Sequence, residues 1–368
     1  YMIAGTNRTA GKSFSKLRFN QGAGSLNPVT GGANNPTPFY SQTLGFTLTS
    51  GTDLPALNLS RVFILSTAET CSASEAVING LRGIDLVLHC AGPFSKTALP
   101  MVRACLAVGA HYLDITGEID VFVDCHGLDA EAQQRGIVVL PGAGFDVVPT
   151  DCLAAILKLE LPTAESLVLA FDAPGGPSPG TAKTAVEGLG KGGRARINGA
   201  MTNVPLAWKT RSFDKNGEAR LAMTIPWGDV YTANISTGIP NIEVYMCVPP
   251  STVAQLRRIR GLGPLLGFAP IQAFLKSQVG RKVRGPSEEK RKDAETWIWG
   301  EATDAAGRQV SAILKTPNGY TLTVLAALGI VAKLMAAQRP IGGFYTPSRF
   351  MGADYVLRLP GVKRVSGK

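Results

Sequence analysis

Four short turns in this sequence hold most of the side chains that could take part in chemistry. They are residues 90–95, 114–118, 141–146 and 149–151, and they are rich in glycine, proline and acidic residues. Each is expected where a parallel strand ends, and ligands of open α/β sheets bind at that carboxyl edge. Any one of them alone is consistent with an ordinary tight turn, but four on one edge predict a binding site.

Three carboxylic acids in these turns are candidate catalytic residues: Asp114, Glu118 and Asp146. A carboxyl group beside a bound cofactor can donate a proton to the substrate or accept one. The competing interpretation is structural, because acidic side chains in turns also cap helices and bind backbone N–H groups. Asp151 has the same ambiguity, since it could cap the helix expected from residue 152.

Candidate substrate contacts are Tyr112, Asp151 and Lys183. Lys183 follows a turn rich in glycine and proline, and its ammonium group could orient an anionic part of a substrate. The alternative is that it is a solvated surface lysine. The histidines are not at metal-ligand spacing, so no metal is predicted, and His89 is expected in the core.

Two glycine-containing turns are the candidate cofactor-binding segments. The first, 5–11, follows a short apolar strand, so its backbone N–H groups and the next helix N-terminus could hold a pyrophosphate. In the second, Gly92 offers a surface without a side chain and Pro93 has a fixed φ, which suits stacking against a nicotinamide. The candidate cofactor-binding residues are Gly5, Thr6, Arg8, Gly11, Cys90, Ala91, Gly92, Pro93, Phe94, Thr116, Gly144 and Phe145.

Strands alternate with helices in the first part of the chain. This alternation predicts an α/β fold that begins with a Rossmann-type parallel-sheet domain over residues 1–150, with right-handed crossovers. Apolar strands are expected at 84–90, 111–115 and 137–140, and helices at 97–108 and 121–135.

The rhythm changes after residue 150, where strand-like runs follow one another with few helices between them. This predicts an α+β substrate or dimerisation domain with a mostly antiparallel sheet over 151–339, and the segment 340–368 is expected to pack back on the first domain. A helix over 320–337 is apolar on nearly all faces and is expected to be buried. The strand-like runs are at 166–171, 202–208, 220–225, 241–248, 295–303 and 309–316.

The composition indicates a globular chain long enough for two domains, with 368 residues, 45% of them hydrophobic and 17% charged. The net charge of +10 does not predict nucleic-acid binding, because acidic residues dilute the one basic zone and no zinc-finger or RNA-binding spacing accompanies it. Six cysteines without a C-x-x-C pair are typical of reduced thiols in the cytoplasm. The opening residues show no signal peptide, and no apolar run reaches the roughly 20 residues of a membrane span.

Several blocks of residues between positions 90 and 349 form a recognisable pattern. They are 90–94 (CAGPF), 112–118 (YLDITGE), 144–152 (GFDVVPTDC), 175–184 (GGPSPGTAKT), 226–229 (PWGD), 238–245 (GIPNIEVY) and 346–349 (TPSR). Together they resemble the saccharopine dehydrogenase-like oxidoreductases, and most closely their trans-acting enoyl reductase branch. The resemblance covers about residues 61–368 and is weak before them. It implies a nicotinamide cofactor, usually the phosphorylated form, and reduction of a C=C or C=N bond.

The opening turn departs from the family pattern, in which a glycine stands where this chain has Arg8. The turn resembles the phosphate loop of NADP-dependent short-chain dehydrogenases, where an arginine reaches the ribose phosphate. A planar guanidinium group suits such bidentate phosphate contact. No acidic residue lies near Ala33 to hold a free ribose diol, so the expected cofactor is NADP, with NAD as the alternative.

An apolar stretch of fifteen residues, 261–275, has basic residues on both sides. It is too short to span a bilayer, but such a segment can lie in a membrane interface. The alternatives are a core helix and a homodimer contact. Pro264, Pro270 and three glycines favour a kinked hairpin or a short helix pair. The expected location is cytoplasmic, with peripheral contact to a membrane or lipid droplet.

These features predict an NAD(P)H-dependent oxidoreductase of a small lipophilic substrate, such as a lipid or polyketide enoyl or imine group. Two alternatives stay open. One is a non-catalytic, membrane-associated protein that keeps the fold. The other is a saccharopine-like amino-acid dehydrogenase, which needs clustered arginines to bind several carboxylates.

Overall fold

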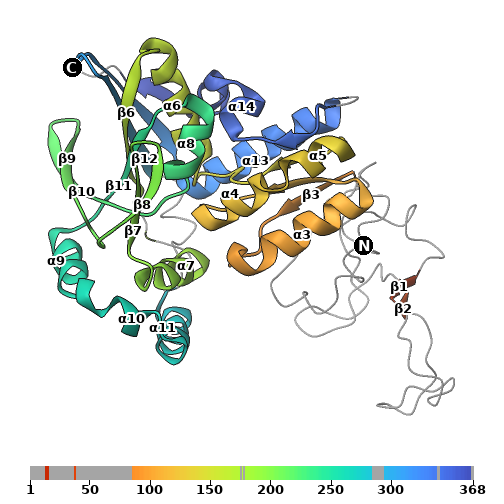
Figure 1. The fold of residues 1–368 in the computed structure, drawn as a ribbon, viewed down its shortest axis with the longest axis horizontal. Coiled ribbons are helices and arrows are strands. Elements are labelled where there is room, and N and C mark those ends of the chain that lie inside the picture. The colour runs from red at the N-terminus through yellow and green to blue at the C-terminus, as the bar shows by residue number, and fades with distance from the viewer. Residues whose placement is uncertain are drawn as a thin grey trace. The chain divides into compact units, whose positions relative to one another are not determined.

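The computed structural model describes residues 85–174, 176, 179–283, 294–337 and 340–365, together with two short strands before them. The chain divides into two compact units, Tyr1–Ile64 and Leu65–Lys368. In the first unit, β1 (Ser13–Ser15) pairs with β2 (Thr37–Pro38) in an antiparallel ladder. All other described elements belong to the second unit (Figure 1).

Four parallel strands form one sheet of the second unit, in the order β14-β5-β4-β3. Most of their side chains are buried, as expected of a parallel sheet covered by other elements. The Rossmann-type parallel sheet predicted from the sequence is thus confirmed. The strands are β3 (Leu86–His89), β4 (His111–Asp114), β5 (Val138–Leu140) and β14 (Gly343–Phe344).

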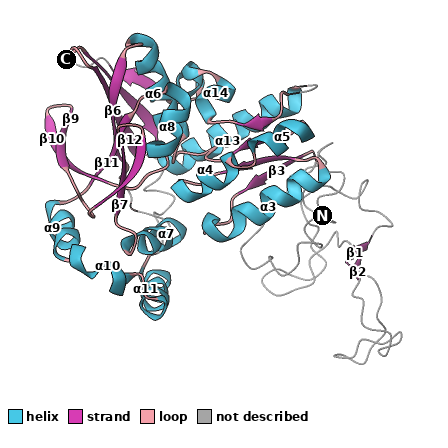
Figure 2. Cartoon of the chain, in the orientation of Figure 1, coloured by secondary structure: helices cyan, strands magenta, loops and turns pink. Residues whose placement is uncertain are grey.

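Three helices follow the strands of this sheet and lie beside it (Figure 2): α3 (Phe94–Val108), α4 (Ile119–His126) and α5 (Asp129–Arg135). α3 ends at Gly109 and α5 at Gly136, whose φ angles are 78° and 65°. Glycine adopts this left-handed conformation without the strain that a side chain would add. The single helix predicted over 121–135 is wrong, since α4 ends before Gly127 and α5 begins after it.

The second sheet is mostly antiparallel, as predicted. Its central path is β15-β13-β12-β6-β11-β10-β9, and β7 pairs with both β11 and β8. Among its described ladders, the one between β6 and β11 is parallel. The strands are β6 (Ala164–Asp172), β7 (Gly193–Ile197), β8 (Ala200–Val204), β9 (Thr210–Lys215), β10 (Glu218–Thr224), β11 (Asn241–Cys247), β12 (Glu295–Asp304), β13 (Gln309–Pro317) and β15 (Lys363–Val365).

One face of the second sheet packs against α6 (Val148–Glu160). The closest approach is at Gly300 of β12, where a Cβ atom would lie 2.7 Å from Cδ1 of Leu157 and 2.8 Å from Cδ2 of Leu153. A side chain at residue 300 would therefore force α6 or the two leucines to shift.

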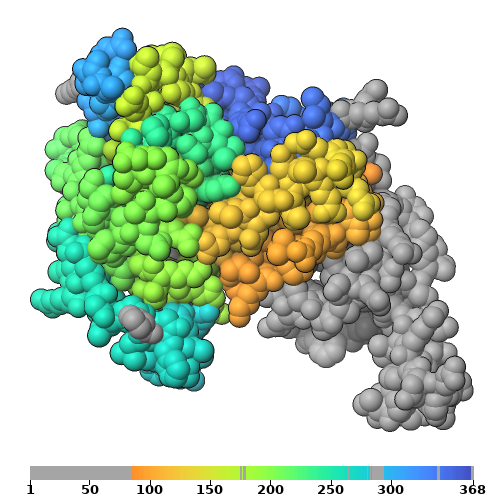
Figure 3. All heavy atoms as spheres, viewed as in Figure 1, coloured from red at the N-terminus to blue at the C-terminus, as the bar shows by residue number. Residues whose placement is uncertain are grey.

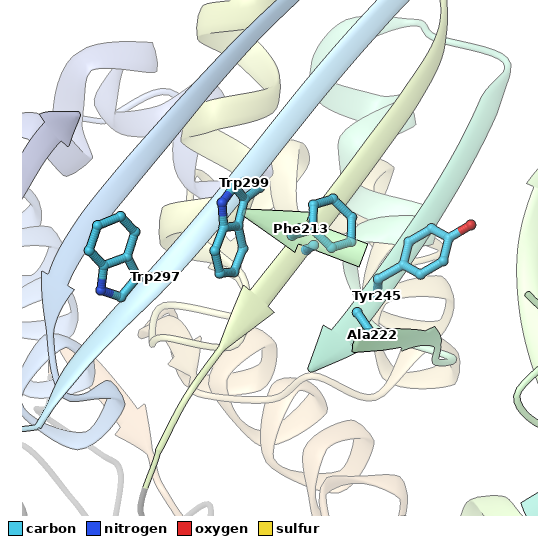
Figure 4. Close-up of a cluster of buried hydrophobic side chains, with 6 residues drawn as sticks. Phe213, Ala222, Tyr245, Trp297 and Trp299 are labelled. Atoms are coloured by element: carbon cyan, nitrogen blue, oxygen red, sulfur yellow. The ribbon is translucent and has the colours of Figure 1, made fainter. Parts of the chain in front are cut away.

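The opposite face of this sheet holds an aromatic cluster. Trp297 and Trp299 point to that face, because alternate residues of a strand face opposite ways, and they pack with Phe213 and Tyr245 (Figure 4). The indole N–H of Trp299 donates to the backbone oxygen of Asp214, 2.9 Å away. Since three strands separate β9 from β12 in the sheet, this bond shows that the β9–β10 hairpin curls over the aromatic face.

The remaining helices surround the second sheet. α8 (Asp229–Thr237) and α14 (Pro347–Met351) pack on α6, and α7 (Pro179–Leu189) packs on α11 (Ala269–Lys282). α13 (Gly319–Ala336) contacts β3 and β13, and so connects the two sheets. The others are α9 (Pro250–Arg258), η3 (Arg260–Leu262), α10 (Gly263–Leu266) and η4 (Ala353–Arg358).

α13 is only partly buried, so the prediction of a fully buried helix is wrong. Val324 and Leu328, one turn apart, are 56% and 55% exposed, whereas Leu322 and Ile330 are fully buried. Gly319–Ala336 is also the one described helix long and apolar enough to cross a membrane, which corrects the expectation from the sequence. Length and composition alone do not distinguish such a helix from one that packs inside a protein.

The C-terminal segment joins both sheets. β14 pairs in parallel with β5 of the first sheet, and β15 pairs antiparallel with β13 of the second. The end of the chain therefore fastens the two sheets together.

Candidate active site

The carboxyl ends of β3, β4 and β5 lie at one edge of the parallel sheet, because these strands are paired side by side. The segments 90–93, 115–118 and 141–147 follow them, and α3, α4 and α6 begin directly afterwards. Three of the predicted turns therefore meet at this edge. The fourth, 149–151, is not a turn but lies in the first turn of α6.

Asp114 connects two of these turns. Its Oδ1 accepts hydrogen bonds from the backbone N–H groups of Thr116 and Gly142, both at 2.9 Å, and its Oδ2 accepts the hydroxyl proton of Tyr112 at 2.8 Å. Burial, partly offset by these hydrogen bonds, raises the pKa of Asp114 to about 6. Asp114 is fully buried and both of its oxygens are engaged, so it positions the turns, and its catalytic role stays a prediction.

Glu118 caps α3. Its Oε1 accepts a hydrogen bond from the N–H of Phe94 at 2.9 Å, and its Oε2 accepts one from the N–H of Ser95 at 2.8 Å. A helix leaves such N–H groups without partners at its start, and a carboxylate also suits the positive end of the helix dipole. Burial raises the pKa of Glu118 above its ordinary value, and the two backbone bonds oppose the rise. The capping role that the sequence left open is the one Glu118 has, and it holds the start of α3 in place.

Asp146 is the third predicted acid, and its surroundings differ from those of Asp114 and Glu118. The residue is partly exposed, and the described residues give its carboxylate no hydrogen-bond partner. It lies against Gly117, where a Cβ atom would be 3.1 Å from Oδ2 of Asp146. Burial, and secondarily the charge of Glu118, raise the pKa of Asp146 to about 7. A carboxyl group with this pKa gains and loses its proton near neutral pH, which suits a general acid.

Phe145 and Trp227 adjoin Asp146, and a third ring, Phe171, packs against both. The indole N–H of Trp227 donates to the backbone oxygen of Asp146 at 2.5 Å. The ring centroid of Phe171 lies 5.1 Å from that of Trp227 and 5.7 Å from that of Phe145. Phe145 and Trp227 are partly exposed, so the surface beside Asp146 is aromatic.

The turn after β3 is accessible. Cys90 and Gly92 are exposed, and Ala91, Pro93 and Phe94 are partly exposed. A Cβ atom at Gly92 would make only ordinary contacts, at 3.5 Å, with the ring of Phe94. The charge of the nearby Asp114 disfavours the thiolate of Cys90, so this thiol is neutral at physiological pH. The turn thus offers an uncharged surface that a flat ring could contact.

Other candidate cofactor residues lie behind this surface. Oγ1 of Thr116 accepts the N–H of Glu118 at 3.0 Å, and a Cβ atom at Gly144 would be 2.9 Å from Cγ2 of Thr323. The N–H of Phe145 donates to Oγ1 of Thr323 at 3.0 Å. Thr116 and Gly144 are buried, so they fix the turns to one another and to α13. The remaining candidates, Gly5, Thr6, Arg8 and Gly11, lie outside the described residues.

The three predicted substrate contacts do not meet at this edge. Tyr112 is fully buried, and so is Asp151. Oδ1 of Asp151 accepts the hydroxyl proton of Ser236 at 2.5 Å, and Oδ2 accepts the N–H of Ser348 at 2.8 Å, which joins α6 to α8 and α14. Both side chains are thus enclosed by the protein, and their contact with a substrate stays a prediction. Lys183 is exposed on α7.

Several polar contacts beside the site involve residues that the sequence did not single out. Oγ of Ser95 donates to Glu187 of α7 at 3.3 Å. Asp120 of α4 pairs with Arg194 of β7 at 2.5 Å and with Lys191 at 2.8 Å. These contacts connect the start of α3 to α7, and the start of α4 to β7 and the turn before it. They join residues more than 70 positions apart, so no local sequence pattern marks them.

The chain matches no protein-family model. It is 29% identical over 126 residues to a saccharopine dehydrogenase-like oxidoreductase of Rattus norvegicus, which is 32% of this chain and 29% of that protein. It is 38% identical over 91 residues to a trans-acting enoyl reductase of Mycobacterium leprae, which is 24% of this chain and 21% of that protein. These matches span less than a third of the length of each relative.

A solved structure has a similar fold. Apo saccharopine dehydrogenase (L-Glu forming) from Saccharomyces cerevisiae aligns with 80% of this chain and 88% of its own, with a TM-score of 0.50 and 10% sequence identity. At that identity the likeness shows the fold alone. The chain is therefore similar in sequence to the saccharopine dehydrogenase-like oxidoreductases and the trans-acting enoyl reductases, and it has the fold of saccharopine dehydrogenase.

Proposed function

We propose that this chain is an NAD(P)H-dependent oxidoreductase that reduces a C=C or C=N bond of a lipophilic substrate. The observation that supports this most is Asp146, a partly exposed residue at the carboxyl edge of the parallel sheet whose carboxyl group has a pKa of about 7. The similarity to oxidoreductases and enoyl reductases supports the same reaction class.

The cofactor's nicotinamide would lie against the turn after β3. The exposed backbone of Gly92 fits a flat ring, and Glu118 keeps this turn in place by capping α3. When bound, the cofactor would supply a hydride to one atom of the substrate's double bond. NADP is the form expected from Arg8, which would contact the 2′-phosphate, and NAD is the alternative.

Asp146 would supply a proton to the other atom of the double bond. Its carboxyl group becomes a carboxylate in that step and takes a new proton from water through its exposed side. The neighbouring charge of Glu118 helps keep the pKa of Asp146 at about 7, so a large fraction of the groups hold a proton at neutral pH. The saturated product then contains the two hydrogens that the reduction requires.

The surroundings of Asp146 favour a lipophilic substrate over one with several carboxylates. Phe145 and Trp227 present partly exposed rings beside it. A saccharopine-like substrate would need arginines with unused donors. Arg194 instead pairs with Asp120, and Arg196 donates to backbone oxygens within its own domain.

Calorimetric titration with NADPH and NADH tests the proposal. The wild-type protein should bind at least one of them, and Gly92→Val should remove binding by obstructing the nicotinamide. Gly261→Val is the matched control, because nothing lies within 4 Å of a Cβ atom there. Arg8→Ala should weaken NADPH more than NADH. A folded wild-type protein that binds neither cofactor would establish the non-catalytic alternative instead.

A further inference from the structure

Residues 250–283 form a helical lobe that consists of α9, η3, α10 and α11. It lies beside α7, apart from the parallel sheet (Figure 1). In the space-filling view the lobe's cyan atoms lie at the lower left of the face shown (Figure 3). Of the two arrangements predicted for 261–275, a kinked hairpin or a short helix pair, the helix pair is the one observed, with α10 and α11 separated at Gly267 and Phe268.

Polar contacts fix the inner side of the helical lobe to α7 and to the segment between β8 and β9. Arg260 donates to the backbone oxygens of Leu206 and Ala207 at 2.6 and 2.5 Å. Lys276 forms an ion pair with Glu187 of α7. A Cβ atom at Gly190, which follows α7, would be 2.6 Å from Cα of Gly267, so backbones meet there directly. The lobe is thus a preformed surface and not a loosely attached tail.

The helical lobe carries a group of exposed apolar side chains. Eleven large hydrophobic side chains are exposed in the described part of the chain, and four of them lie within residues 262–274. Leu262, Leu265, Phe268 and Phe274 are 46%, 52%, 58% and 61% exposed. Soluble proteins rarely gather exposed apolar side chains in this way unless the patch binds something.

The charge of the helical lobe is of one sign. Residues 250–283 contain six cations, Arg257, Arg258, Arg260, Lys276, Arg281 and Lys282, and no Asp or Glu. Arg258 and Arg281 are exposed, one on each side of the apolar patch in the sequence. Apolar side chains between exposed cations complement a bilayer whose headgroups are anionic.

We infer that the helical lobe docks on an anionic lipid surface, with Leu262, Leu265, Phe268 and Phe274 inserted among the headgroups and Arg258 and Arg281 facing lipid phosphates. A second copy of this chain fits the patch less well. A symmetric contact would bring two cationic lobes together, in a protein whose net charge is already +10. The inference does not depend on the proposed reductase activity, because the lobe uses none of the residues at the carboxyl edge.

Vesicle flotation with the full chain tests the inference. The protein should float with phosphatidylglycerol-containing vesicles at about 0.1 M salt and with pure phosphatidylcholine vesicles much less. Salt near 1 M shortens the screening length from about 10 Å to about 3 Å, so it should release a large part of the bound protein. Leu265→Ser with Phe268→Ser should lower binding roughly tenfold or more. Arg258→Gln with Arg281→Gln should weaken binding to anionic vesicles only.

The matched control replaces two other exposed apolar residues, Leu159→Ser with Ile341→Ser, which are 73% and 81% exposed outside the helical lobe. This variant should float like the wild type. Circular dichroism and cofactor titration of each variant report whether the fold is kept. Three results would overturn the inference: no flotation of the wild type at low salt, equal loss in the control, or a dimer in sedimentation that Leu265→Ser with Phe268→Ser converts to a monomer.

Discussion

Asp146 lies directly on Gly117: a Cβ atom at residue 117 would be 3.1 Å from Oδ2 of Asp146 and 3.2 Å from its Cβ. The two residues come from different turns, one after β4 and one after β5. The absence of a side chain at Gly117 therefore allows the acid of one turn to approach the helix cap of the other, since Glu118 is the next residue. This approach explains why the charge of Glu118 acts on the pKa of Asp146.

Gly117→Ala should lower the rate of reduction about tenfold while leaving cofactor affinity nearly unchanged. The added methyl group must push the Asp146 side chain away by a few tenths of an ångström, and small misplacements of a reacting group lower rates strongly. Steady-state kinetics and calorimetry measure the two effects separately. Gly261→Ala, where nothing lies within 4 Å of the new Cβ atom, should behave like the wild type. Equal kcat in both variants would contradict the role of this contact.

Asp146→Asn should lower kcat by a factor of about 10² to 10⁴, the usual contribution of a general acid. The wild-type rate should fall as the pH rises through about 7, because the pKa of Asp146 is about 7 and only the protonated form donates. The asparagine variant should lose this pH dependence. Asp124→Asn, at an exposed position on α4, is the control. If the pH profile of Asp146→Asn matched that of the wild type, another group would be the proton donor.

The edge of the parallel sheet could be predicted from the sequence, because strands and the turns after them are local patterns. The roles of the acids at that edge could not. Asp114, Glu118 and Asp146 look alike in sequence, but Asp114 bonds to a turn 28 positions away. Glu118 bonds 24 positions back, to Phe94. Only the register of the strands decides which acid is left with an unused carboxylate.

The break at Gly127 and the exposure of α13 were also beyond the sequence pattern. An apolar helix is buried only where other elements cover it, and α13 contacts both sheets with one side alone. The contacts of Glu187 with Ser95 and of Asp120 with Arg194 depend on how the second sheet meets α3 and α4. Such long-range placement leaves no trace in residue spacing.

Asp114→Asn should keep the protein stable and active, whereas Asp114→Ala should destabilise it by roughly 3 kcal/mol or more. Asparagine can accept the N–H groups of Thr116 and Gly142 and donate to the hydroxyl oxygen of Tyr112. Alanine leaves all three buried groups without partners. Chemical denaturation measures the difference. Loss of activity in a stable Asp114→Asn protein would show that Asp114 is catalytic after all.

The raised pKa of the Asp114 carboxyl group also predicts that the stability of the protein depends on pH. The pKa of Asp114 rises from 3.8 to about 6 on folding, so the folded state holds this proton more tightly than the unfolded state. Its contribution to the free energy of unfolding is fully present below about pH 4 and is lost as the pH rises through about 6. This part of the pH dependence should be missing in Asp114→Asn. The difference between the two unfolding curves between pH 4 and about 7 isolates it.

Glu118→Ala should lower the free energy of unfolding by about 0.5–2 kcal/mol, the usual cost of removing a helix cap. Glu118→Gln should lower the free energy of unfolding less, because the glutamine amide oxygen still accepts a hydrogen bond from one of the two N–H groups, of Phe94 or Ser95. The Glu118→Gln substitution also removes the negative charge that helps raise the pKa of Asp146. The pH at which the reduction rate falls should therefore be lower in Glu118→Gln than in the wild type. An unchanged midpoint would mean that the two carboxyl groups do not interact.

Gly300→Ala should lower the free energy of unfolding by about 1–3 kcal/mol, the usual cost of overfilling a core. The new Cβ atom would be 2.7 Å from Cδ1 of Leu157 and 2.8 Å from Cδ2 of Leu153, so α6 must move or both leucines must change rotamer. Gly188→Ala is the matched control within α7, where nothing lies within 4 Å of the added atom. It should stabilise by about 0.5–1 kcal/mol, because alanine favours helices over glycine. Combining Gly300→Ala with Leu157→Val should cost less than the sum of the two single changes, since valine makes room for the methyl group. Additive losses in this cycle would show that the close approach of α6 to β12 does not limit the size of residue 300.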